Sequence, residues 1–179
     1  MARFAIALLA LSAAACSGKD PYNPGEPIGE FHVTAKLVSS TCGQTPNPWE
    51  FDVKLRHDQS TLFWVQGGAP ANGHVDPRAR ATITSTASQT LRDADPKTGL
   101  PACVVSRADA LDVTLASGGA PASDLKTATA FAGSLTYTFT PGQGSDCSDQ
   151  LLSTSGDYES LPCAIHYELS GQRTKDLPK

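Results

Sequence analysis

WEFDVKLR, residues 49–56, alternates apolar and charged side chains without a break. Its odd-numbered positions are aromatic or aliphatic, and its even-numbered positions are all acidic or basic. Successive side chains of a β-strand point to opposite faces, so a period of two is typical of a strand with one buried face. The stretch predicts a β-strand with one side in a hydrophobic core and the other in water.

The same alternation recurs through most of the chain after residue 30. The further predicted strands are 31–37, 61–66, 74–76, 79–85, 110–116, 131–139 and 163–169. The segments between them are rich in Gly, Pro, Ser and Asp, which favour turns, and short helices are expected only at 122–128 and 148–153. We expect an all-β domain of seven to eight antiparallel strands, arranged as a β-sandwich or as a small closed β-barrel. Both architectures produce this alternation, so both remain open.

The charge of the chain is mild and scattered. Its 14 basic and 18 acidic residues give a net charge of −4 at pH 7 with His neutral. No cluster of Lys and Arg offers a surface that would neutralise phosphates, so nucleic acid is not expected as a partner.

The first residues have the composition of a secretory signal. Arg3 provides the positive charge, residues 4–11 form an apolar run, and residues 13–15 are all Ala, the small residue that a signal peptidase requires. The run is too short to cross a bilayer, which takes about 20 apolar residues in a helix. We expect residues 1–15 to be a signal peptide that is removed on export.

Cysteine usage sets Cys16 apart from the other four cysteines. The total of five is odd, and an unpaired thiol in an exported protein calls for an explanation. Without Cys16, the four that remain can form two disulfides: Cys42, Cys103, Cys147 and Cys163. The nearest-neighbour pairing, Cys42–Cys103 with Cys147–Cys163, is the one we expect. The alternative, Cys42–Cys163 with Cys103–Cys147, would suit a barrel whose first and last strands pair.

The N-terminus resembles a bacterial lipoprotein signal, in which a box of small residues ends in a cysteine. The match is Ala14, Ala15 and Cys16, and the chain departs from the family at Ala13, where the family usually has Leu. The resemblance implies that Cys16 becomes the first residue of the mature protein and carries diacylglycerol, a lipid anchor to a membrane. Because Ser17 rather than Asp follows, it also implies the outer membrane more than the inner one. The alternative is an ordinary signal cleaved after Ala15, with Cys16 left as a thiol.

A polar segment with three prolines separates this cysteine from the first alternating stretch. We expect residues 16–30 to be the lipidated N-terminus and an extended tether, and residues 31–179 to be a single β domain.

No catalytic or metal-binding motif stands out. The chain has no G-x-S-x-G stretch for a nucleophilic serine, no CxxC or His-bearing spacing for zinc, and no recognised motif around its histidines, His32, His57, His74 and His166. The acidic loops lack the full ligand pattern of a calcium site and are typical of turns: Asp93, Asp95, Asp146, Asp149, Asp157 and Glu159. We expect no cofactor, no metal and no enzymatic activity.

Trp64 is the aromatic residue whose position the alternation leaves open, because residues 61–66 are apolar on both faces. We take it as the candidate for a surface contact, whereas Trp49, Tyr137 and Tyr167 fall on faces expected to pack in the core. The expected function is that of a membrane-anchored envelope lipoprotein whose β domain binds a partner protein or has a structural role. The alternative is a lipocalin-like carrier of a small apolar ligand, because an eight-stranded barrel can hold one.

Overall fold

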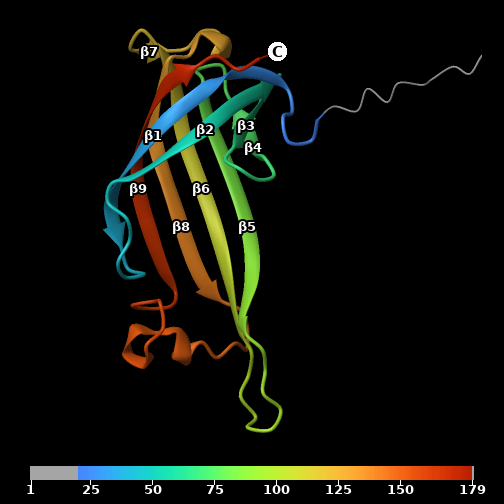
Figure 1. The fold of residues 1–179 in the computed structure, drawn as a ribbon, viewed down its shortest axis with the longest axis vertical. Helices are drawn as coiled ribbons and strands as arrows, with labels where there is room; N and C mark the ends of the chain where they lie inside the picture. The colour runs from blue at the N-terminus through green and yellow to red at the C-terminus, as the bar shows by residue number, and fades with distance from the viewer. Residues whose placement is uncertain (1–19, 179) are drawn as a thin grey trace, which may run out of the picture.

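The structure, a computed structural model, describes residues 20–178. Nine β-strands make up most of them, and three short 3-10 helices lie in the connections (Figure 1). The strands are β1 (Glu26–Ser40), β2 (Trp49–Asp58), β3 (Thr61–Val65), β4 (Ala71–Val75), β5 (Arg80–Arg92), β6 (Cys103–Ser117), β7 (Ala120–Pro121), β8 (Ala130–Pro141) and β9 (Cys163–Lys175). The helices are η1 (Leu125–Thr127), η2 (Ser148–Gln150) and η3 (Leu152–Thr154).

Eight of the strands form a closed antiparallel β-barrel. Their hydrogen-bonded order is β5-β4-β3-β2-β1-β9-β8-β6, and β5 also pairs with β6, which closes the circle. The two residues of β7 extend the sheet beside the end of β6. The first and last long strands pair along their length, from Glu30 opposite Lys175 to Ser40 opposite Ile165. The barrel is therefore the correct choice between the two expected architectures.

The barrel is closed along only part of its length, because its strands differ in length. β3 and β4 have five residues each, whereas β1, β5, β6 and β9 have 13 to 15. β4 pairs with β5 only at residues 81–83, and β2 pairs with β1 only as far as Ala35. Beyond these points β1, β9, β8, β6 and β5 continue as a curved sheet with an inner face that β2–β4 do not cover (Figure 1). We call this part the extended sheet and the remainder the closed barrel.

Apolar side chains fill the closed barrel. Phe31 and Leu55, on alternating positions predicted to be buried, have no exposed surface. The rings of Phe31 and Phe131, on the two strands that flank β9, lie 5.6 Å apart, and the ring of Trp64 lies 5.5 Å from Phe131. A Cβ atom on Gly171 would come within 2.1 Å of the Phe131 ring, so glycine in β9 leaves the space that this ring occupies. The apolar alternation thus forms one continuous core.

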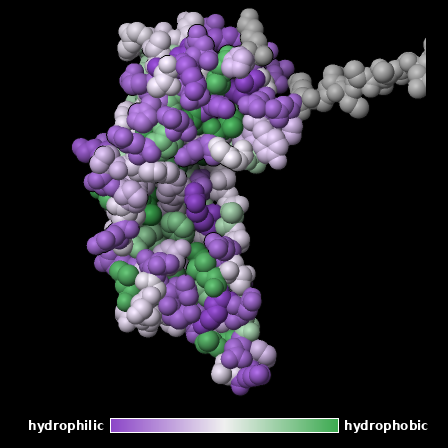
Figure 2. Space-filling model, in the orientation of Figure 1, coloured by the Kyte–Doolittle hydropathy of each residue, from purple (hydrophilic) through white to green (hydrophobic). Residues whose placement is uncertain are grey.

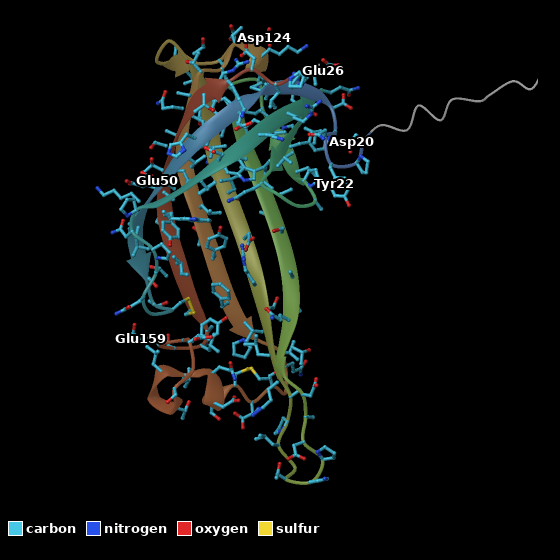
Figure 3. The ribbon with its side chains drawn as sticks, viewed as in Figure 1. Asp20, Tyr22, Glu26, Glu50, Asp124 and Glu159 are labelled. Carbon is cyan, nitrogen blue, oxygen red and sulfur yellow. A yellow bond between two sulfur atoms is a disulfide. The ribbon has the colours of Figure 1, made fainter. Side chains whose placement is uncertain are left out.

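The disulfides are Cys42–Cys163 and Cys103–Cys147, so the expected nearest-neighbour pairing is wrong and the alternative is confirmed. The sheet order is the reason. β1 and β9 are antiparallel neighbours, which places the loop after β1 beside the first residue of β9. In the same way β6 and β8 are neighbours, and the loop after β8 returns to the start of β6. Figure 3 shows both disulfides, as yellow bonds, in the part of the molecule that the extended sheet forms.

The β domain begins earlier than expected. Residues 26–30, assigned to the tether, form the first part of β1, and Ile28 within them is 1% exposed. The buried Arg56 side chain donates hydrogen bonds to the carbonyls of Pro24 at 2.9 Å and Gly25 at 2.7 Å, which fixes the segment before the strand. Prolines and glycines on both sides of Ile28 hid this strand in the sequence. A tether would therefore end near Asn23, beside the closed barrel.

Candidate functional site

An ion pair faces inward in the middle of β6. The inward row of this strand contains Arg107 and Asp109 between the buried side chains of Val105 and Leu111. The Arg107 Nε–H donates to Asp109 Oδ1 at 2.6 Å, and Nη2 donates to Oδ2 at 2.8 Å. Leu111, the next inward-facing residue along β6, lies opposite Ile83, which is the last residue of β5 to pair with β4. The inner face thus becomes charged at the level where the barrel opens.

Tyr137 completes this group from the neighbouring strand β8, where it lies opposite Asp109. The Arg107 guanidinium carbon lies 4.3 Å from the centre of the Tyr137 ring. Burial raises the pKa of Tyr137 to about 12, against the opposing effect of the nearby Arg107 charge. The hydrogen bonds that Arg107 donates to Asp109 raise the pKa of Arg107. At neutral pH the inner face therefore presents a guanidinium, a carboxylate and a neutral phenol.

These three side chains line a pocket of about 320 Å³ at the mouth of the closed barrel, which we call the mouth pocket. The end of the β3–β4 hairpin forms one wall, and the inner faces of β5, β6 and β8 form the other. Besides the three polar residues, the lining consists of Trp64, Gln66, Ala69, Ala71, Ile83, Ser85, Leu111 and Leu135. Figure 2 views this side of the molecule and shows hydrophobic side chains next to strongly hydrophilic ones below the closed barrel. A few polar groups on an apolar wall are typical of small-molecule sites.

A second pocket, of about 230 Å³, lies further along the extended sheet on the other side of Arg107. It is lined by Ala87, Ser88, Gln89, Leu91, Val105, Phe139 and Tyr158 in addition to Arg107, and we call it the lower pocket. The rings of Phe139 and Tyr158 lie 5.7 Å apart. Several of these residues pack on a small second core around the Cys103–Cys147 disulfide.

The predicted surface contact at Trp64 is wrong. Its side chain is 7% exposed, and its ring packs between Phe51 at 6.3 Å and Phe131 at 5.5 Å. Trp64 points across the closed barrel, which is narrow enough for the facing wall to bury the ring. Its exposed edge forms the inner end of the mouth pocket.

The acidic residues considered for calcium close turns. Asp146 accepts a hydrogen bond from the Ser148 N–H at 3.0 Å, and Asp95 accepts one from the Lys97 N–H at 2.9 Å. These backbone hydrogen bonds hold the pKa of both carboxyl groups below the usual range. Among residues 20–178, no group of three or more His, Cys, Asp or Glu side chains is placed to hold a metal ion.

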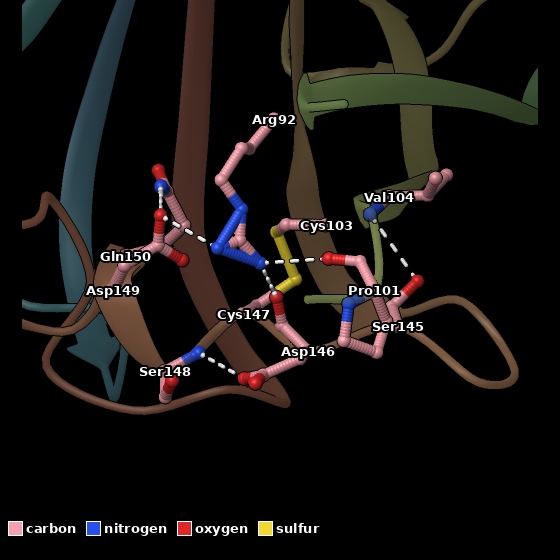
Figure 4. The surroundings of a disulfide bond; sticks show 10 residues. All are labelled: Arg92, Pro101, Cys103, Val104, Ser145, Asp146, Cys147, Ser148, Asp149 and Gln150. Carbon is pink, nitrogen blue, oxygen red and sulfur yellow. Dashed lines mark hydrogen bonds and ion pairs between the residues drawn. A yellow bond between two sulfur atoms is a disulfide. The ribbon is translucent and has the colours of Figure 1, made fainter. Parts of the chain in front are cut away.

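Arg92 organises the surroundings of the Cys103–Cys147 disulfide, as Figure 4 shows. Its guanidinium donates to the carbonyls of Pro101 at 3.0 Å and Asp146 at 2.5 Å, and it lies 3.3 Å from the Asp149 carboxylate. These contacts tie three loop segments to the end of β5. These contacts indicate a structural role for Arg92.

Three of the four histidines, His32, His74 and His166, lie on the outer side of the sheet. His32 bonds Asp52 at 2.9 Å on an exposed surface, and His166 bonds Thr136 at 2.9 Å. His32 lies opposite Gln172, whereas His166 lies opposite Ser39, seven residues further along β1. The histidines therefore do not converge on one site.

Of the residues that line the mouth pocket, the sequence singles out Trp64 as a candidate contact but not the polar group of Arg107, Asp109 and Tyr137. Tyr137 was expected in the core, and residues 103–109 were not assigned to a strand. The alternation along β6 contains the signal that identifies Arg107 and Asp109. At intervals of two residues, they continue the inward-facing row of Leu111, Val113 and Leu115. A charged pair in that phase indicates an inner face that is open to water.

The predicted signal peptide and Cys16 lie outside the described residues, and within residues 20–178 no helix has the length and apolar character needed to cross a membrane. Comparison of the chain with known proteins found no matching family, no matching curated protein and no matching solved structure.

Proposed function

We propose that the domain binds a small amphipathic molecule in the mouth pocket. The observation that carries this proposal is the Arg107–Asp109 pair on the inner face, beside an apolar wall. A half-exposed ion pair contributes little to stability, about 0–1 kcal/mol, so its inward position is poorly explained by folding alone. The apolar part of a ligand would pack against Trp64 and Leu135, and its polar part would meet Arg107 and Tyr137.

This site differs from the enclosed cavity of a lipocalin-like carrier. Aromatic rings occupy the interior of the closed barrel, so the ligand would lie at its mouth, with part of its surface in water. A site that leaves part of the ligand in water is better suited to transient binding and release than to storage of the ligand. The expectation that the chain is not an enzyme stays a prediction.

The proposal is tested with Nile red, a neutral amphipathic dye whose emission shifts to the blue in apolar surroundings. Ser85 is exposed and lines the pocket, so Ser85→Phe should fill it without disturbing the core. Thr86→Phe places the same side chain on the adjacent exposed position, facing the outer side of the sheet. Saturable dye binding by the wild type and by Thr86→Phe, lost in Ser85→Phe, would support the proposal. Equal binding by both variants would overturn it.

We also propose that the chain is exported and anchored by lipid on Cys16, more to the outer membrane than to the inner one. Two features support this: the resemblance of the N-terminus to a lipoprotein signal, and the two disulfides, which persist in oxidising compartments. Seven residues separate Cys16 from Pro24, a reach of about 25 Å at full extension. The anchor would therefore hold the closed barrel near the membrane surface.

A further inference from the structure

The edge of β5 is unpaired over seven residues. β4 pairs with β5 only at residues 81–83, and within the described chain no strand pairs with this side of β5 from Thr84 onward. All residues from Thr84 to Thr90 are exposed, although the other side of the strand pairs with β6 throughout. On the free side, alternate backbone N–H and C=O groups of a regular strand are left to solvent.

The opposite edge of the extended sheet, on β1, is covered. There the Leu37 N–H donates to the Asn47 side chain at 3.2 Å, so the loop after β1 lies along the strand. A register irregularity between Leu37 and Ser39 interrupts the strand, and Lys36 carries a charge. Bulges, charges and covering loops are the usual means by which proteins keep an edge from pairing.

The β5 edge has none of these protective features. Residues 84–90, TSTASQT, contain no charge and no proline, and the first register irregularity follows at Thr90–Arg92. Threonine favours extended backbone, and hydroxyl side chains on neighbouring strands pair well. The asymmetry between the two edges indicates that the β5 edge is kept open for pairing.

The lower pocket lies directly beside this edge and indicates what pairs there. Two of the three inward side chains of the edge, Ser85 and Ala87, are small, and beyond Ala87 the pocket is lined by Gln89, Leu91, Val105 and Phe139. A strand added to β5 would place its own inward side chains next to these residues. The pocket volume of about 230 Å³ fits one large apolar side chain.

We propose that the β5 edge, Thr84–Thr90, is a docking site for an extended segment of another protein, which adds a strand to the sheet and inserts one large apolar side chain into the lower pocket. Main-chain hydrogen bonds supply affinity in this mode of recognition, and the pocket supplies specificity. A second copy of this chain fits less well, because its own edge offers only Ser85, Ala87 and Gln89 on the inward face, and none of them fills the pocket. This site adjoins the mouth pocket, because Ser85 of the edge and Arg107 of the lower pocket also line the mouth pocket.

The test uses a fluorescent peptide of alternating pattern, KTVTFTVTK, whose Val and Phe side chains share one face. Ala87→Glu introduces a charge on the docking edge itself, at the wall of the lower pocket. Ala108→Glu is the matched control, an exposed alanine on β6. We expect saturable binding to the wild type and to Ala108→Glu, weakened by roughly tenfold or more in Ala87→Glu. Nile red binding should be the same in the wild type and in Ala108→Glu.

Two further measurements separate strand addition from nonspecific adhesion. A peptide methylated on alternate backbone nitrogens, and one with Asp in place of Phe, should both fail to bind, and bound KTVTFTVTK should slow amide hydrogen exchange at residues 84–90. No binding of KTVTFTVTK, equal affinity for Ala87→Glu, or unchanged exchange at 84–90 would overturn the proposal. A wild-type dimer that Ala87→Glu dissociates would overturn it in favour of a second copy.

Discussion

The chemistry of the mouth pocket depends on Arg107, Asp109 and Tyr137, whose side chains contact one another. Asp109 uses both carboxylate oxygens on Arg107, and Arg107 in turn lies over the Tyr137 ring. The pair is neutral as a whole, so the strongest attraction for an added anion is already used within the chain. The arrangement favours a ligand whose polar part is uncharged and accepts hydrogen bonds from the phenol or the free guanidinium nitrogens.

The raised pKa of Tyr137 predicts a pH dependence of the free energy of unfolding. The folded value of about 12 lies above the ordinary value of 10, because burial disfavours the phenolate. The stabilising contribution of the neutral phenol is therefore complete below pH 10 and is lost as the pH rises toward 12. We expect the free energy of unfolding, measured with urea, to fall across this interval, and Tyr137→Phe to make the fall smaller.

Absorbance at 295 nm provides the independent measurement for this residue. Tyr137 should ionise at about pH 12, and this step should be missing in Tyr137→Phe. Tyr158, whose pKa burial also raises, serves as the comparison through Tyr158→Phe. A titration in which Tyr137→Phe removes a step near pH 10 would contradict the buried environment described here.

At the scale of elements, the sequence locates every strand of the barrel and fails on their lengths. The period-two alternation marks strands where one face is buried, and in the closed barrel that condition holds. In the extended sheet it fails: residues 84–90 of β5 are exposed on both faces, and β6 carries Arg107 and Asp109 on its inner face. In β5 and β6 the parts that the alternation missed are the open parts, where both proposed sites lie, whereas residues 26–30 of β1 and 170–175 of β9 were missed within the closed barrel.

Disulfide pairing could not be derived from spacing along the chain. The partner of each cysteine is set by which strands are neighbours, and the order β1-β9-β8-β6 joins the first strand to the last. The sequence pattern is compatible with several strand orders, since alternation defines a face and not a neighbour. Once pairing of the first and last strands is accepted, the observed disulfides follow.

The Cys103–Cys147 disulfide should stabilise one end of the molecule more than the other. It closes a separation of 44 residues, worth about 4 kcal/mol in the chain-entropy description. It also packs in the small second core, apart from the closed barrel. We expect the double variant Cys103→Ala/Cys147→Ala to lower the free energy of unfolding by up to about that amount, and to speed amide exchange at residues 143–161 more than at 50–65.

Cys42→Ala/Cys163→Ala is the matched control for this experiment, because it removes the disulfide that links β1 to β9. Its effect on exchange should centre on residues 41–48 and the start of β9. Exchange that rises equally throughout the barrel in Cys103→Ala/Cys147→Ala would show that the second core is not an independent unit.

At the scale of the whole molecule, the two ends of the barrel have different surroundings. The chain enters beside the closed barrel, where Nζ of Lys126 in η1 lies 3.8 Å from the carboxylate of Glu26 at the start of β1. The loop at residues 93–102 projects from the other end, beyond a β5 strand of 13 residues, roughly 40 Å long. If Cys16 carries the lipid, the closed barrel lies nearer to the membrane, and the mouth pocket and the β5 edge face away from it.

Energy transfer to a labelled bilayer tests this orientation together with the anchor. A donor dye is placed on a non-natural amino acid at Ser123, near η1, or at Lys97, in the far loop, both of which are exposed. The full-length protein is produced in a host that lipidates exported chains and is reconstituted with acceptor-labelled lipids. Energy transfer should be stronger from Ser123 than from Lys97, because the tether is shorter than the barrel and keeps the end near η1 closer to the bilayer. Cys16→Ala should abolish transfer from both positions, and the intact mass of the wild type should include diacylglycerol. Equal transfer from the two positions would refute the orientation, and an unmodified mass would refute the anchor itself.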